Sequence, residues 1–245
     1  MGTSEKIVGL TLCALTCVAP QASASSIIDF LGEGKAAVVN IHSPSLGNLS
    51  VWAGELDWSW VGSKPPGFDA SLYSYCVDAN HYLLDPQTVA VSTTDYLTAP
   101  DSGAGAKVGW LFDTFAPWIH ASGTGGDAAA LQIAIWESLY DTPIFDSNGL
   151  RPDLMLSGGS FSASAAGSVI GRAEQYLSDL YVGTSGAYHS GTTVWLDATS
   201  GQDQVIAAPV PEPGTLALCG LGVAAGLAVR RRRRGAAGGS RAVVG

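Results

Sequence analysis

Positive charge is scarce in the central part of this chain. Of the 12 Lys and Arg residues, five lie within residues 25–209, where nineteen acidic side chains leave a formal charge of −14. Nucleic acids and anionic membrane surfaces are bound by basic patches, and this region contains no Lys/Arg cluster. We therefore expect no nucleic acid among the partners of this region.

Cysteine is equally scarce once the two ends are set apart. The chain has 4 cysteines, of which Cys13 and Cys17 lie in an N-terminal apolar run and Cys219 in a C-terminal one. Cys76 alone remains between the ends, which excludes a disulfide within the central region. In an oxidising compartment a lone cysteine is buried and inert, paired with another chain, reactive, or otherwise chemically occupied.

Motifs for metals and phosphates are absent as well. The four histidines do not show a His-x-x-x-His spacing, and the aspartates do not form an Asp-x-Asp-x-Asp-Gly calcium loop. Gly-x-Gly occurs at residues 32–34 and 103–105, without the strand and helix of a phosphate-binding loop. We expect no metal ion and no cofactor.

The N-terminus has the features of a secretory signal peptide. Lys6 is followed by an uncharged run over residues 7–19 and by the small-x-small pattern Ala-Ser-Ala at residues 22–24. The residues that precede its two cysteines are not of the small type that a lipidation signal needs. We predict a signal peptide over residues 1–24, cleaved after Ala24, and no lipid anchor.

The C-terminus carries a second targeting signal. Val210, Pro211, Glu212 and Pro213 precede a charge-free run over residues 214–229, and five consecutive arginines follow. This order resembles the PEP-CTERM sorting signal, which an exosortase processes during export to the surface of Gram-negative bacteria that produce exopolysaccharide. An ordinary tail anchor is the alternative.

The same run predicts how the chain meets the inner membrane. It is short for a transmembrane helix, and arginines after an apolar run stay on the cytoplasmic side. We therefore expect residues 210–234 to form a sorting signal with a short, temporary membrane span. Residues 235–245 are expected to form a disordered cytoplasmic tail, so that residues 25–209 are exported.

The exported region is long enough for one domain with a substantial core. Alternating apolar patterns predict strands, and helical spacing predicts three helices, the first ending or kinking at Pro117. We predict an α+β fold in which an antiparallel β sandwich or barrel-like framework carries an inserted group of about three helices. The expected strands cover residues 36–41, 49–60, 72–77, 87–96, 192–196 and 204–208, and the expected helices cover residues 108–117, 127–141 and 162–180.

The second predicted helix contains one unusual residue. Asp127 is expected to cap its start, and Gln132 shares a face with Trp136 and Leu139 in an otherwise apolar segment. A buried amide without partners costs about 1–3 kcal/mol. The simplest interpretation is a core glutamine whose amide is satisfied by backbone groups.

Two motifs support a second interpretation. Tyr75-Cys76-Val77-Asp78 and Leu131-Gln132-Ile133-Ala134-Ile135-Trp136 resemble the two signatures of the bacterial thioester domain family, although that family commonly has threonine at the position of Leu131. The resemblance implies that the Cys76 sulfur displaces ammonia from Gln132 to form an internal thioester. It also implies a shielding pocket, for which Trp136 and Tyr73 or Tyr75 are the candidates.

The resemblance also suggests a function. A thioester would be opened by an amine or hydroxyl on a surface polymer, matrix polymer or partner protein, leaving a covalent link at Gln132 and a free Cys76 thiol. This describes adhesion or crosslinking rather than enzymatic turnover. Because we expect Gln132 in the first turns of its helix, we also expect the helix N-terminus to lower the pKa of the Cys76 thiol.

Two other functions remain open. The protein is either a passive matrix or envelope protein with an inert Cys76, or a cysteine hydrolase with His81, His120 or His189 as the base. Alternating tryptophans at positions 52, 58 and 60 fit a carbohydrate-stacking platform, but we expect them to belong in part to the core.

The predicted signal peptide is directly testable. The exported protein should begin at Ser25, as measured by N-terminal sequencing. A mature chain that begins within residues 7–19 would contradict the predicted cleavage after Ala24.

Overall fold

The computed structural model describes residues 25–92, 103–141, 144–145, 152–153, 156–157, 159–183 and 193–209. Several predictions lie outside the described residues: the signal peptide with Ala24, the sorting signal over 210–234, the tail over 235–245, and His189. Within the described ranges, none of the helices is long and apolar enough to cross a membrane.

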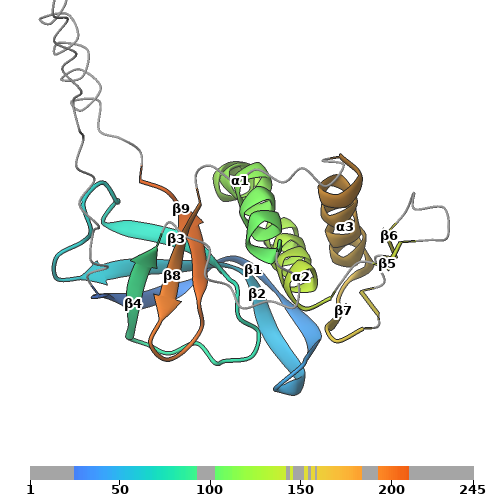
Figure 1. Ribbon diagram of the computed structural model, residues 1–245, viewed down its shortest axis with the longest axis horizontal. Coiled ribbons are helices and arrows are strands. Elements are labelled where there is room, and N and C mark those ends of the chain that lie inside the picture. The colour runs from blue at the N-terminus through green and yellow to red at the C-terminus, as the bar shows by residue number, and fades with distance from the viewer. Residues whose placement is uncertain are drawn as a thin grey trace, which may run out of the picture.

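The strands form a closed antiparallel sheet, which agrees with the barrel-like framework predicted from the sequence (Figure 1). β1 pairs with β2, and the order continues through β3, β9, β8 and β4 back to β1. Such closure removes open sheet edges. The strands of this ring are β1 (Ser25–Ser43), β2 (Gly47–Val61), β3 (Ser71–Cys76), β4 (Gln87–Ser92), β8 (Thr193–Ala198) and β9 (Gln204–Ala207).

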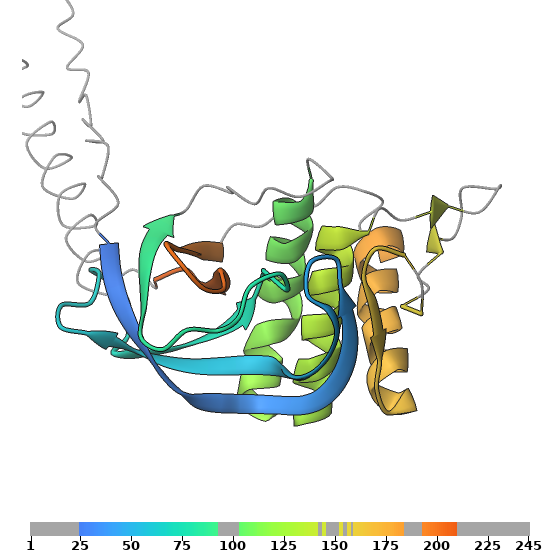
Figure 2. The same ribbon diagram turned by 90° about the horizontal axis from the view of Figure 1, so that it is seen from below.

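β1 is much longer than the predicted strand over residues 36–41. Its register against β2 shifts between Phe30 and Gly32 and again between Glu33 and Ala36, each time with an extra residue on β1. Gly54 of β2 faces the second shift and has a φ of +138°. Bulges bend a strand, and Figure 2 shows the β1–β2 hairpin curving beside the helices.

Three helices lie beside the barrel, so the predicted α+β class is confirmed. They are α1 (Ala104–Ser122), α2 (Gly125–Tyr140) and α3 (Gly167–Ser178), and a short π-helical turn, η1 (Asp179–Gly183), follows α3. α2 lies between α1 and α3 and against β1 and β2 (Figures 1 and 2). Every residue from Ala128 to Leu139 is buried, which confirms the predicted buried helix.

The boundaries of α1 and α3 differ from the prediction. α1 continues through Pro117 because tertiary contacts hold its last turn: Lys35 Nζ donates to the carbonyls of Ile119, at 2.7 Å, and His120. Residues 162–164, predicted as helix, form β7 (Ser162–Ser164), which pairs with β1. Two further short strands, β5 (Ile144–Phe145) and β6 (Pro152–Asp153), pair with each other.

The start of α2 also corrects a prediction. Thr124 is the N-cap, and Asp127 lies in the first turn, where its carboxylate accepts from the Thr124 N–H at 2.9 Å. The Thr124 hydroxyl accepts in return from the Asp127 N–H at 3.2 Å, which completes a capping box. The glycine-rich segment over residues 123–126 is therefore a defined junction between α1 and α2.

Gly125 lets α2 approach β1 closely, which a single substitution can test. A Cβ on Gly125 would lie 2.4 Å from the Ala36 carbonyl oxygen, so Gly125→Ala should lower the free energy of unfolding by more than about 1 kcal/mol. Urea denaturation measures this change.

The matched control is Gly171→Ala on the exposed side of α3, where a Cβ meets nothing within 4 Å. Because alanine favours a helix over glycine, this variant should gain up to about 1 kcal/mol. Equal effects of the two substitutions would contradict the close packing of α2 on β1.

Candidate functional site

Cys76 is the last residue of β3 and lies at an interior position. Its neighbour across the sheet is Gln204 of β9, and its side chain is a buried free thiol. The sulfur contacts the main chain of Asp78, with the carbonyl oxygen at 3.1 Å and the nitrogen at 3.3 Å. The chain thus turns tightly just after the cysteine.

Gln132 reaches this turn from α2. Its carbonyl oxygen Oε1 accepts from the Cys76 N–H at 3.0 Å, and its Nε2 donates to the Cys76 carbonyl at 2.7 Å. Gln132 as a whole is 1 % exposed, so these bonds are buried. The structure therefore brings together the two residues that the sequence singled out, although they are 56 positions apart.

The expected effect of the helix N-terminus on the thiol is wrong. α2 begins at Gly125, so Gln132 lies midway along the 16-residue helix. Burial raises the pKa of the Cys76 thiol far above its usual range, and the opposing effects of the Asp78 backbone and the Trp136 side chain are smaller. The sequence missed this because the glycines before Asp127 conceal the first turn of the helix.

Cys76 and Gln132 line the same cavity, of about 350 Å³. Its walls are mostly apolar and come from β1, β2, α2 and the segment after β3, which includes the strongly exposed Tyr82. Trp136 lines it as well, one turn after Gln132. Its buried indole N–H has no hydrogen-bond partner of good geometry in the described part of the chain.

The two tyrosines expected as shields lie elsewhere. Tyr75 packs its ring edge-on against Phe112 of α1, and Tyr73 stacks on His120 with centroids 4.1 Å apart. Neither is among the residues that line the cavity. Side chains alternate along a strand, so Tyr73 and Tyr75 point away from the face that holds Cys76.

Tyr140 of α2 bonds to the segment that follows Cys76, and the sequence reasoning missed it. Its hydroxyl accepts from the Ala79 N–H at 3.0 Å and from Asn80 Nδ2 at 3.2 Å, and donates to Asp78 Oδ1 at 3.4 Å. Gln132, Trp136 and Tyr140 recur at intervals of four residues, which places them on one helix face. That spacing was the available signal.

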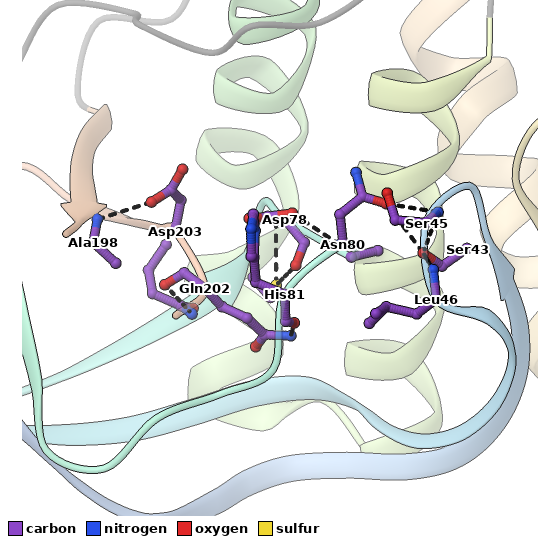
Figure 3. A network of polar contacts seen from close by, with 12 residues as sticks. Ser43, Ser45, Leu46, Asp78, Asn80, His81, Ala198, Gln202 and Asp203 are labelled. Atoms are coloured by element: carbon purple, nitrogen blue, oxygen red, sulfur yellow. Dashed lines mark hydrogen bonds and ion pairs between the residues drawn. The ribbon is translucent and has the colours of Figure 1, made fainter. Parts of the chain in front are cut away.

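A polar network surrounds the segment after Cys76 (Figure 3). The Asp78 carboxylate accepts from the Asn80 N–H at 2.8 Å and pairs with His81 Nδ1, while Gln202 Nε2 donates to the His81 carbonyl at 2.7 Å. The hydrogen bond and charge of Asp78 raise the pKa of His81. His81 also lines the cavity, so the structure places one histidine near the cysteine.

His120, the other candidate base within the described ranges, is engaged away from Cys76. His120 pairs with Glu55 at 3.0 Å and stacks on Tyr73. The Cys76 sulfur makes no hydrogen bond to a histidine of the described ranges. Within those same ranges, no three His, Cys, Asp or Glu side chains are grouped to hold a metal ion.

The tryptophans divide as expected between core and surface. Trp58 and Trp60 are buried, and Trp52 is exposed at the cavity wall. Trp58 Nε1 donates to Ser74 Oγ at 2.9 Å, and Ser74 in turn donates to Gln204 Oε1 at 3.0 Å. The Gln204 side chain therefore belongs to a separate set of hydrogen bonds, with Ser74 and Trp58.

Comparison with known proteins identifies the C-terminal signal. The PEP-CTERM protein-sorting motif matches residues 209–233. No curated protein and no solved structure matches the chain. The motif indicates an exported protein that an exosortase-type enzyme recognises and sorts to the cell surface or extracellular matrix of a Gram-negative bacterium.

Asp203 yields a prediction about pH. Burial and then the charge of Asp78, opposed by the Ala198 N–H hydrogen bond, raise the pKa of Asp203 from 3.8 to about 6. Between these values the folded protein binds more protons than the unfolded chain, so its stability falls as pH rises. Because Asp203 is half-buried, Asp203→Asn should raise the unfolding free energy at neutral pH by only about 1 kcal/mol.

Denaturation at a series of pH values tests this prediction. The gain in unfolding free energy of Asp203→Asn should vanish below about pH 3.8, where the wild-type carboxyl is protonated in both states. Asp29→Asn, at an exposed position of β1, is the control and should show a smaller change. A gain that is the same at every pH would contradict the role assigned to the Asp203 charge.

Proposed function

We propose that this exported protein forms an internal thioester between Cys76 and Gln132 and uses it to attach covalently to a surface or matrix partner. The observation that carries the proposal is the pair of hydrogen bonds between the Gln132 carboxamide and the main-chain N–H and carbonyl of Cys76. Both side chains also line one cavity.

Both reacting side chains lie at the end of β3, where Gln132 bonds to the Cys76 main chain. The Cys76 sulfur would attack the Gln132 carbonyl carbon, the C–N bond would break, and the thiol proton would leave with the nitrogen as ammonia. The Cys76 N–H already donates to Gln132 Oε1 and would stabilise the charge that develops on that oxygen. The Trp136 indole N–H is a second buried donor beside the sulfur, where its interaction lowers the pKa of the Cys76 thiol against the larger, opposite effect of burial.

The surroundings suit a bond that water must not reach. The cavity wall is mostly apolar, and Cys76 is only 3 % exposed. An amine or hydroxyl entering the cavity would attack the acyl carbon, form an amide or ester at Gln132, and release the Cys76 thiol. Each molecule would react once, so attachment describes the process better than turnover.

A passive matrix protein is the second candidate, because the same two hydrogen bonds satisfy the polar groups of a core glutamine. The cysteine hydrolase has less support. Such an enzyme needs a thiolate activated by a nearby base. Here the sulfur makes no hydrogen bond to any described histidine, and of the described candidate bases only His81 lines the same cavity.

The intact mass of the purified exported domain separates the first two candidates. A thioester predicts a mass lower than that of the sequence by one ammonia, and treatment with methylamine should add one methylamine to the chain. Cys76→Ala should abolish the deficit because the sulfur is lost. An untreated mass equal to that of the sequence would sink the proposal.

A matched pair of variants identifies the acyl residue. Gln132→Glu lacks the ammonia to be displaced and should show no deficit. Gln204→Glu alters an equally buried glutamine directly across the sheet from Cys76 and should keep the deficit in folded protein. If the deficit survives in Gln132→Glu but is lost in Gln204→Glu, the thioester forms at Gln204, which contradicts the proposal for Gln132.

A further inference from the structure

His81 occupies a distinctive place beside the proposed thioester. It lines the cavity that holds Cys76 and Gln132, and its side chain is 64 % exposed while that of its partner Asp78 is 15 % exposed. The imidazole is thus reachable from solvent, whereas the carboxylate that holds it is largely enclosed.

The network in Figure 3 fixes the orientation of this imidazole. Nδ1 faces the Asp78 carboxylate, so the neutral ring carries its proton on Nδ1 and leaves Nε2 as the basic nitrogen. Asn80 and Tyr140 hold the carboxylate, and Gln202 holds the His81 main chain. This arrangement of a histidine aligned by a carboxylate is the one that general bases use.

Opening a buried thioester requires two proton transfers. The attacking amine or hydroxyl must lose a proton as its bond to carbon forms. The departing sulfur must gain one, because burial strongly disfavours a Cys76 thiolate. A group that accepts the first proton and supplies the second would assist both halves of the step.

We propose that His81, aligned by Asp78, is this proton-transfer residue when a nucleophile opens the Cys76–Gln132 thioester. The inference rests on the proposed function. In the step, the nucleophile forms a bond to the Gln132 acyl carbon and its proton passes to His81 Nε2. The C–S bond breaks, and the proton passes on to Cys76 Sγ, so that the imidazole ends neutral.

The charges around His81 give the reaction a pH signature. Asp78 raises the pKa of His81 most, and Asp203 raises it further, while the small degree of burial lowers it. Glu33 of β1 also lines the cavity. His81 should therefore lose its proton above the ordinary histidine value of 6.5, and the rate of opening should rise with pH through that range.

The test is the rate at which methylamine opens the thioester, divided by the concentration of unprotonated methylamine and followed by intact mass over a series of pH values. His81→Gln should keep the ammonia deficit but open at least about tenfold more slowly near neutral pH, since general bases contribute this much or more. The histidine step in its pH profile should disappear. Added imidazole should restore part of the rate in His81→Ala, which a purely structural role would not produce.

His42→Gln is the control, because His42 is an exposed histidine that bonds to Asn48 and does not line this cavity. It should open at the wild-type rate. If His81→Gln has the ammonia deficit but an unchanged rate and pH profile, the proposed role of His81 is wrong while the thioester stands. A wild-type protein without the deficit would instead overturn the thioester.

Discussion

The two hydrogen bonds between the Gln132 carboxamide and the main chain of Cys76 join the helical layer to the barrel. Each is buried, so losing a partner would cost about 1–3 kcal/mol without help from solvent. They also define the distance between the end of β3 and the middle of α2. The cavity, the turn at Asp78 and Trp136 all lie beside these two bonds.

Burial at this point has opposite effects on stability and on reactivity. It strengthens the hydrogen bonds of Gln132 and would protect an acyl–sulfur bond from water. It also raises the pKa of the Cys76 thiol, which makes a thiolate costly whether the thiol attacks or departs. A half-exposed polar network lies beside the cavity and consists of Asp78, His81 and Gln202. Under the proposal for His81, a proton supplied from this network would avoid the cost of a buried thiolate.

Much of the fold and part of the site could be predicted from sequence. The α+β class, the barrel-like sheet and the buried helix with Gln132 follow local hydrophobic periodicity, which reports burial directly. The length of β1, the passage of α1 through Pro117 and the strand over residues 162–164 could not be predicted. They depend on register shifts, on Lys35 and on pairing with β1, all of which are contacts between distant segments.

The sequence by itself determined the sorting signal, the single cysteine between the two ends and the apolar helix around Gln132, because each is a property of a continuous segment. Only the tertiary structure decided what Cys76 meets. Alternation along β3 turned Tyr73 and Tyr75 toward α1. Helix periodicity brought Trp136 to the cavity that Cys76 lines, and Tyr140 to the segment after the cysteine. Contacts of this kind depend on how a strand and a helix 56 residues apart pack together, and no local pattern encodes that packing.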